Sequence, residues 1–409
     1  MRAGGRRGLR AAILALVGLI GACAAEPKCA APEAPPETPK GLEHFRAALA
    51  DLAAGRRAAP VAILHLGDSH IALDHLTGAM RAHWTAEFGD AGRGLPPGIP
   101  YRYYAPQGYE VSMRGDWEVA SSLGRAAHGL FGLQGYRVSS GDSRAETTIE
   151  AERDFSMVEI DAIGGPETGS LLLQIDGAAP LRLVTRSDRP ELVQLRVPAA
   201  AAHRLTLRPA GDGPVNLLGW ALLRNGPGIR YDSHGISGAT IDVTERWDEA
   251  IFSRQMASLA PDLVILGYGT NEGFNDALDL DAYSRRFEKL IIRIRRDVPS
   301  ASIAVLGAFD GARRAGTGAA TTCGDGWTVP PKLDRLRETQ REVAARTGAF
   351  YFDTSRVMGR PCGIDQWAKA TPPLAWPDRV HLKPEGARRM GEAIRQALTG
   401  ASATRVCPK

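Results

Sequence analysis

The chain has 409 residues, of which 44% are hydrophobic and 23% are charged, and its formal net charge is +4. This composition is ordinary for a globular protein, and the length allows a catalytic core and a second unit, so we expect two domains. Basic residues are spread along the chain without a basic block, which argues against nucleic acid binding.

The N-terminus has the pattern of a secretory signal peptide, which we assign to residues 1–22. Four arginines precede an apolar stretch, residues 11–20, that is too short to span a bilayer as a mature helix. Residues 19–23 (Leu-Ile-Gly-Ala-Cys) resemble the lipobox of bacterial lipoproteins, which implies lipidation of Cys23; the alternative is an ordinary cleavage site with a chance cysteine. Ala24 in place of an aspartate then implies a periplasmic protein held at the outer membrane by its lipid. Residues 23–41 are rich in proline and alanine and predict an extended tether.

Four cysteines remain if Cys23 is acylated, and an even number in an oxidising compartment permits two disulfides. Cys323 and Cys362 flank the same part of the chain, whereas Cys29 and Cys407 lie near its ends, so we expect these two pairs. Metal binding is the rival interpretation, but no two cysteines have close ligand spacing. We therefore expect no metal site.

The next elements in chain order predict the start of an α/β core, residues 42–90. A helical pattern covers residues 42–54, and an apolar run at residues 63–66 predicts a buried strand. Another helical pattern follows at residues 76–88. Residues 91–227 differ, because short alternating apolar runs there are separated by turn residues, for example at residues 157–160, 171–177, 181–184, 192–197 and 203–207. Such spacing predicts a β-sandwich or jelly roll.

The α/β pattern resumes in residues 228–400. Continuous apolar runs at residues 263–268 and 303–308 are typical of strands buried on both faces, and helical patterns cover residues 286–296, 332–346 and 385–398. We therefore expect an α/β fold whose parallel sheet is interrupted in sequence by an inserted β domain. Residues 401–409 form a tail.

Candidate catalytic residues lie in the two halves of this core. The strand at residues 63–66 leads into Gly67, Asp68 and Ser69, which would place the Ser69 hydroxyl at the carboxyl edge of the sheet, where open α/β sheets hold their active sites. A serine hydroxyl needs a general base, and the base needs a partner that fixes its tautomer. His381 and Asp378 can be those groups. The alternative is that Ser69 only caps a helix.

Two further residues could stabilise a negative tetrahedral intermediate. Gly238 offers a backbone N–H in a glycine-containing loop, and Asn271 offers a side-chain amide just after a strand. Either could instead serve only its own loop.

The segments GDSH (residues 67–70), ISGAT (236–240), GTNE (269–272) and DRVH (378–381) resemble, in order, the four sequence blocks of the SGNH hydrolases, also called GDSL-like esterases and lipases. The resemblance implies a three-layer α/β/α fold. It also implies that Ser69 is the nucleophile and that Asp378 and His381 complete the triad. Ser69, Gly238 and Asn271 would supply the oxyanion donors.

The sequence departs from the family pattern at two positions. His70 stands where the namesake motif has leucine, and Glu272 where many members have aspartate. Both spellings are similar to the peptidoglycan O-acetylesterases, a branch with a carbohydrate-binding-module-like β-sandwich inserted after the first block. Asp68, His70, Thr270 and Glu272 are candidate pocket residues because they adjoin the implied catalytic groups.

The resemblance implies a serine esterase that removes O-acetyl groups from a cell-envelope polysaccharide, with peptidoglycan as the expected partner and with no cofactor. An O-acetyltransferase or a lipid or thioester hydrolase could use the same residues. A third possibility, of another class, is a non-catalytic lipoprotein whose β insertion binds glycan.

Overall fold

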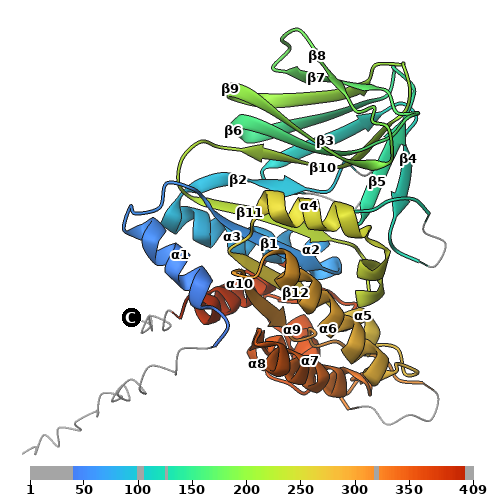
Figure 1. Cartoon of the computed structure of the whole chain (residues 1–409). Coiled ribbons are helices and arrows are strands. Elements are labelled where there is room, and N and C mark those ends of the chain that lie inside the picture. Colours follow the sequence, from blue (N-terminus) through green and yellow to red (C-terminus); the bar gives the residue numbers. More distant parts are fainter. Residues whose placement is uncertain (1–39, 99–105, 125–127, 317–321, 401–409) are drawn as a thin grey trace, which may run out of the picture. The chain divides into compact units, whose positions relative to one another are not determined.

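A hydrogen-bonded sheet of 14 strands runs through the computed structural model, which describes residues 40–98, 106–124, 128–316 and 322–400 (Figure 1). The expectations for the signal peptide, Cys23, Cys29, the tether, Cys407 and the tail lie outside these residues. Part of the sheet is parallel and part is antiparallel. The two parts differ in what covers them.

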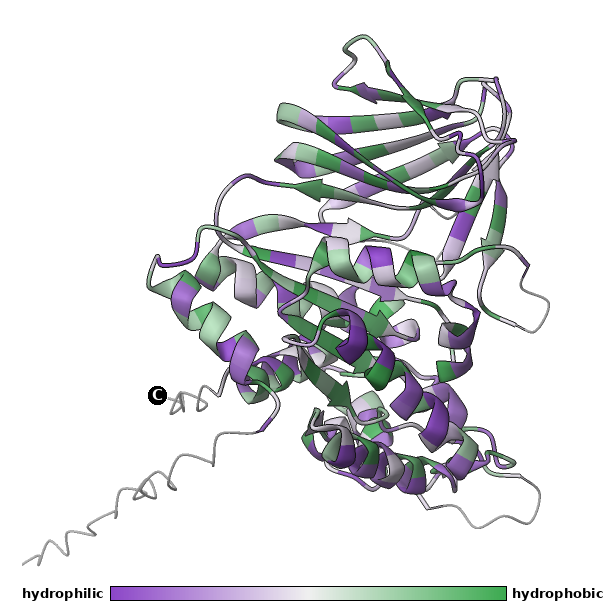
Figure 2. Ribbon diagram, in the orientation of Figure 1, coloured by the Kyte–Doolittle hydropathy of each residue, from purple (hydrophilic) through white to green (hydrophobic). Residues whose placement is uncertain are grey.

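The parallel part has β1 near its middle, in the order β16-β13-β12-β1-β11-β2. Its strands are β1 (Val61–Gly67), β2 (Asp90–Leu95), β11 (Ile229–Gly235), β12 (Leu263–Gly267), β13 (Ser302–Leu306) and β16 (Phe350–Phe352). Every residue of β1, β12 and β13 is buried, as expected for strands covered on both faces. Figure 2 shows these strands as mostly hydrophobic. The predicted α/β fold with a parallel sheet is therefore confirmed.

Successive residues of a strand point to opposite faces of the sheet, and both faces of this part are apolar. Helices cover both of these faces. Ile63 packs in one hydrophobic cluster and Leu64 in the other. The Ile63 cluster includes residues of α1 (Glu43–Ala53), α3 (His75–Phe88), α8 (Thr354–Met358), α9 (Gly363–Lys369) and α10 (Pro384–Thr399). The Leu64 cluster includes residues of α4 (Glu249–Leu259), α6 (Leu280–Asp297) and α7 (Leu333–Thr347). The result is a three-layer α/β/α arrangement.

The antiparallel part contains the β-rich segment predicted from the short apolar runs. Its strands are β3 (Tyr109–Arg114), β4 (Glu118–Ser121), β5 (Tyr136–Ser140), β6 (Glu146–Gly164), β7 (Ser170–Ile175), β8 (Leu181–Val184), β9 (Glu191–Pro209) and β10 (Val215–Leu223). The apolar runs at residues 192–197 and 203–207 belong to the single long strand β9. They read as separate runs because residues 198–202 between them are one proline and four alanines, and β6 pairs with β9 through register shifts in this region.

The two parts share one sheet without a break. β2 pairs in parallel with β11 and antiparallel with β10, so it belongs to both parts. The boundary expected between residues 90 and 91 therefore falls inside a strand that the core uses. An independently folding insertion over residues 91–227 stays a prediction.

Short elements complete the described chain, namely α2 (Ser69–Ala72), a 3₁₀ helix (Ile241–Arg246), α5 (Thr270–Gly273) and the two-residue strands β14 (Arg313–Arg314) and β15 (Trp327–Thr328). A disulfide joins Cys323 to Cys362. Within the described ranges, no helix combines the length and the apolar character needed to cross a bilayer.

Candidate active site

Three neighbouring strands of the parallel part end on the same rung of the sheet. Gly67 at the end of β1 pairs with Gly235 of β11 on one side and with Gly267 of β12 on the other. A Cβ atom on Gly67 would lie 2.5 Å from the Gly267 carbonyl oxygen, so only glycine allows this close approach. The chain leaves all three strands at the same edge, and Ser69, Gly238 and Asn271 follow within a few residues.

Ser69 begins the short helix α2, but it does not cap that helix. Asp68 is the N-cap, and its carboxylate accepts a hydrogen bond of 3.0 Å from the His70 backbone N–H. The Ser69 hydroxyl is thus left for another partner, although the residue is only 5% exposed.

That partner is His381, in the loop before α10. His381 Nε2 lies 2.9 Å from Ser69 Oγ, and His381 Nδ1 lies 2.7 Å from Asp378 Oδ2. The other carboxylate oxygen of Asp378 accepts the backbone N–H groups of Val380 (2.9 Å) and His381 (3.1 Å). These contacts connect Ser69, His381 and Asp378 in a hydrogen-bonded chain of the kind that serine hydrolases use.

The electrostatics of Asp378 suit a partner for the histidine. Burial opposes ionisation of its carboxyl, but the hydrogen bonds from the His381 ring and from the two backbone N–H groups outweigh burial and lower its pKa to about 2. A carboxylate that stays charged at neutral pH favours the tautomer with hydrogen on Nδ1. Nε2 is then free to accept the Ser69 proton.

Possible oxyanion donors lie at the ends of the neighbouring strands. Gly238 has φ +79°, a backbone conformation that favours glycine. Within the described residues, no acceptor contacts the backbone N–H of Ser69 or of Gly238. The Asn271 side chain donates one hydrogen bond of 2.8 Å to the Ala239 carbonyl, which fixes the amide beside the Gly238 loop and leaves its second N–H available.

Residues 206–389 match the family model described as the GDSL-like lipase/acylhydrolase family. The match includes Gly238, Asn271, Asp378 and His381, but Ser69 precedes it. Among solved structures, a peptidoglycan O-acetylesterase matches with a TM-score of 0.71 and 25% sequence identity, over 87% of this chain and 95% of that chain. Together, the family match over residues 206–389 and this likeness support an acylhydrolase of the SGNH type. The part of this chain that the matched structure does not cover is far shorter than residues 91–227. The likeness therefore includes β-rich structure as well as the core.

Other solved structures resemble smaller parts of this chain. A GDSL-like lipase from Parabacteroides merdae has a TM-score of 0.30 and 19% identity over 42% of this chain and 73% of that chain. An acetyl xylan esterase has a TM-score of 0.30 and 17% identity over 41% of this chain and 80% of that chain. No curated protein matches the sequence.

A hollow of about 460 Å³ opens beside the triad of this hydrolase. Its lining contains Asp378 and His381 together with Leu73, His75, Ser237, Trp376 and Pro377. Sequence reasoning missed Trp376 as a pocket residue, although its position two residues before Asp378 in the DRVH loop was a usable signal.

The four residues that the sequence named as possible pocket residues are all buried. Asp68, His70, Thr270 and Glu272 are each at most 4% exposed, and none is among the residues that line the hollow. Thr270 Oγ1 accepts the Phe309 backbone N–H at 3.3 Å, and Glu272 Oε1 accepts the Ile241 backbone N–H at 2.7 Å. The side chains of Thr270 and Glu272 thus hold neighbouring loops, because each buried backbone N–H needs an acceptor.

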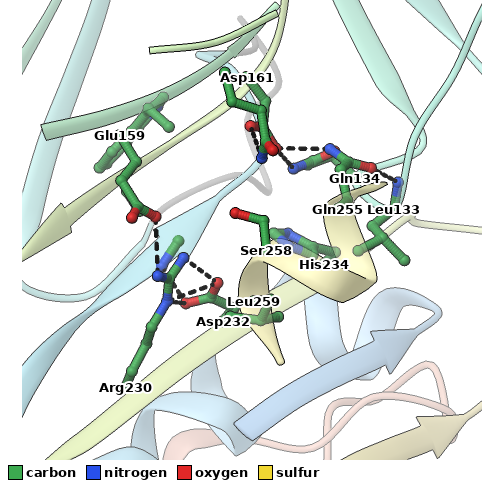
Figure 3. A pocket seen from close by; sticks show the side chains of 14 residues that line it. Leu133, Gln134, Glu159, Asp161, Arg230, Asp232, His234, Gln255, Ser258 and Leu259 are labelled. Atoms are coloured by element: carbon green, nitrogen blue, oxygen red, sulfur yellow. Dashed lines mark hydrogen bonds and ion pairs between the residues drawn. The ribbon is translucent and has the colours of Figure 1, made fainter. Parts of the chain in front are cut away.

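A second, smaller cavity of about 40 Å³ lies between the antiparallel strands, β11 and α4, and no triad residue lines it (Figure 3). Asp161 accepts hydrogen bonds there from Gln194 and Gln255, and Arg230 pairs with Glu159 and Asp232. Arg230 is thus paired with two carboxylates and Asp161 is hydrogen-bonded by two amides, and the cavity has room for a few water molecules. We interpret it as a structural polar network. Among the described residues, no three His, Cys, Asp or Glu side chains are grouped as metal ligands.

Proposed function

We propose that this hydrolase is a serine esterase that removes O-acetyl groups from peptidoglycan. The observation that carries the proposal is the likeness, at a TM-score of 0.71, to a peptidoglycan O-acetylesterase across both the α/β core and the β-rich part. The hydrogen-bonded chain from Ser69 through His381 to Asp378 supplies the groups that such a reaction needs.

In the first step, Ser69 Oγ attacks the carbonyl carbon of the acetyl ester while His381 Nε2 takes the hydroxyl proton. Asp378 stabilises the imidazolium that forms. The carbonyl oxygen becomes an oxyanion, which the N–H groups of Ser69, Gly238 and Asn271 would bind. The tetrahedral intermediate then collapses, and His381 returns the proton to the departing sugar oxygen. The products of this step are the free sugar hydroxyl and an acetyl ester on Ser69.

In the second step, water attacks the acetyl ester while His381 again acts as the base. The Ser69 hydroxyl is restored and acetate leaves. If a second sugar hydroxyl reached the acetyl-enzyme before water, the same residues would transfer the acetyl group instead. The identity of the second nucleophile therefore separates an esterase from a transferase.

The test is acetate release from O-acetylated peptidoglycan by the purified protein, beside Ser69→Ala and with acetylated xylan as a second substrate. We expect release without any added sugar acceptor, faster from peptidoglycan than from xylan, and lost in Ser69→Ala. Release from xylan alone would show that peptidoglycan is not the substrate. Acetyl transfer without release would replace the esterase by a transferase.

We also propose that the protein is anchored in the cell envelope through lipidated Cys23, on the strength of the signal-like N-terminus and the sequence that precedes this cysteine. In a bacterial host, radiolabelled fatty acid should enter the full chain and not the Cys23→Ser variant. The unmodified protein should sediment with outer membranes. Equal labelling of both proteins would contradict the proposal.

A further inference from the structure

We propose that Trp376 is a stacking platform for the sugar ring that carries the acetyl group. This inference rests on the proposed function and extends it, because it names the part of the substrate that the hollow beside the triad recognises. It assigns Trp376 a role in selecting a carbohydrate ester over a simple ester.

Trp376 is unusual in its exposure. The residue is 43% exposed, and no other tryptophan or phenylalanine of the described residues is classed as exposed. An exposed indole loses the favourable burial that aromatic side chains normally gain. It also lines the hollow that holds Asp378 and His381.

The backbone holds Trp376 in a fixed place relative to the catalytic base. The Trp376 N–H donates to the His381 carbonyl at 2.8 Å, and the Arg379 N–H donates to the Trp376 carbonyl at 3.1 Å. Next to these bonds, Ala375 and Leu382 form an antiparallel bridge. The turn that carries Asp378 and His381 therefore carries the indole as well. A group placed on that indole has a defined position relative to His381 Nε2.

The indole itself is oriented by a cation. Lys383 Nζ lies 4.9 Å from the centroid of the Trp376 ring, within the range of a cation–π contact. This contact limits rotation of an otherwise exposed side chain. A preoriented platform costs less ordering on binding than a mobile one.

The rest of the hollow suits a sugar ring. Its volume of about 460 Å³ is far more than an acetyl group fills, and Leu73 and Pro377 add apolar wall. The imidazole of His75 also lines it. A pyranose offers an apolar C–H face to the indole and hydroxyl groups to the imidazole. Stacking on one aromatic face with few polar contacts is common in small-molecule sites.

The experiment compares two esters in the same enzyme. A small aryl acetate has the acetyl group but no sugar ring, whereas O-acetylated peptidoglycan has both. We expect Trp376→Ala to keep kcat/KM for the aryl acetate within about twofold and to lower kcat/KM for peptidoglycan by about tenfold, mainly through KM. Trp376→Phe should recover much of the loss, because a phenyl ring still offers a face.

The matched control is Trp117→Ala. Trp117 is only partly exposed, its indole N–H donates to the Arg114 carbonyl, and it lies between β3 and β4 of the antiparallel part. This variant should leave both activities unchanged. A loss on peptidoglycan equal to that of Trp376→Ala would overturn the platform, because the β-rich part would then hold the sugar.

The other outcomes separate the platform from the proposed function. Equal losses on both esters in Trp376→Ala and Trp376→Phe would overturn the platform, since the indole would then only shape the His381 loop. Unchanged activity on peptidoglycan in Trp376→Ala would also overturn it. If the unmodified enzyme cleaves the aryl acetate and xylan but not peptidoglycan, the proposed substrate fails, and the same comparison on acetylated xylan decides whether Trp376 holds a sugar ring.

Discussion

His70 joins the serine loop to the carbonyl of Val380 in the histidine loop. Its Nε2 lies 3.1 Å from the Val380 carbonyl oxygen, and its Nδ1 lies 3.0 Å from Asp68 Oδ1. The ring also stacks on Phe309, with centroids 4.1 Å apart and an interplanar angle of 7°. The two loops come from positions about 310 residues apart in sequence, so this ring is a direct connection between them.

We predict that His70→Leu, which restores the residue of the namesake motif, weakens catalysis without weakening binding. Leucine packs on Phe309 but cannot bridge Asp68 and Val380, so the His381 loop loses one anchor. We expect kcat for an aryl acetate to fall about tenfold with KM nearly unchanged, a loss of about 1.4 kcal/mol. His70→Gln, which keeps a donor, should retain more activity. A raised KM with unchanged kcat, or equal losses of kcat in both variants, would contradict this role.

Asn271→Ala should slow the reaction much more than it destabilises the fold. The substitution removes an amide that we propose binds the oxyanion, and loss of one such donor typically costs about 10²–10³ in kcat. Asn275→Ala is the matched control, because Asn275 is exposed just after α5 and, among the described residues, its side chain accepts only the nearby Ala277 N–H. Steady-state kinetics and thermal unfolding of both variants decide the matter. Unchanged kcat in Asn271→Ala would remove Asn271 from the oxyanion hole.

The sequence predicted the parallel core well because its strands are continuous apolar runs and its helices have clear periodicity. It also predicted that Ser69 and His381 would meet, because a serine nucleophile needs a base, and the resemblance of the four ordered blocks strengthened that pairing. The sheet explains it physically. Gly67 pairs with Gly235 and with Gly267 at the ends of three adjacent strands, so the loops that follow them lie together. The order of the strands in a sheet cannot be derived from periodicity.

The sequence was less informative where tertiary contacts decide a residue's environment. Thr270 and Glu272 adjoin catalytic residues in sequence, but each accepts a backbone N–H from another segment and is buried. Trp376 was overlooked because an indole is more often buried than exposed. The join of β2 to both β11 and β10 was also hidden, because residues 90–95 contain two glycines and show little alternation.

Glu272 should make stability depend on pH. Burial raises the pKa of Glu272 to about 8 from an ordinary value of 4.5, against the lowering effect of its hydrogen bond from the Ile241 N–H. Between pH 4.5 and 8 the folded protein therefore binds more protons at this site than the unfolded chain does. Stability contributed by the protonated carboxyl is complete below pH 4.5 and is lost as the pH rises toward 8.

The corresponding variant is Glu272→Gln, which keeps the acceptor oxygen for Ile241 and cannot ionise. We expect its Tm to exceed that of the unmodified protein at pH 8 and to differ little at pH 4.5. Calorimetry across this range checks the prediction. Glu342→Gln, on an exposed face of α7, is the control and should leave the pH dependence unchanged. Parallel Tm curves for Glu272→Gln and the unmodified protein would contradict the raised pKa.

The disulfide between Cys323 and Cys362 supports the catalytic loop from two sides. Cys362 is the N-cap of α9, and α9 carries Asp365, whose Oδ1 lies 3.1 Å from Arg379 Nε. On the other side, the Cys323 N–H donates to the Trp327 carbonyl, and the Trp327 ring lies 4.8 Å from the Arg379 guanidinium carbon. Arg379 stands directly after Asp378, and its φ of +56° is a conformation that needs support from its neighbours.

We therefore predict that Cys323→Ser with Cys362→Ser lowers both stability and activity. A bridge with a sequence separation of 39 residues contributes about 3–4 kcal/mol in the chain-entropy model, so Tm should fall by several degrees. The kcat for an aryl acetate should fall at temperatures well below the new Tm, because Asp378 and His381 lose part of the frame that holds Arg379. With Cys29 and Cys407 replaced by serine, so that the second expected disulfide cannot contribute, reduction with dithiothreitol should reproduce both effects and should leave the protein that also carries Cys323→Ser and Cys362→Ser unchanged. A lower Tm with unchanged kcat would limit the disulfide to a role in stability.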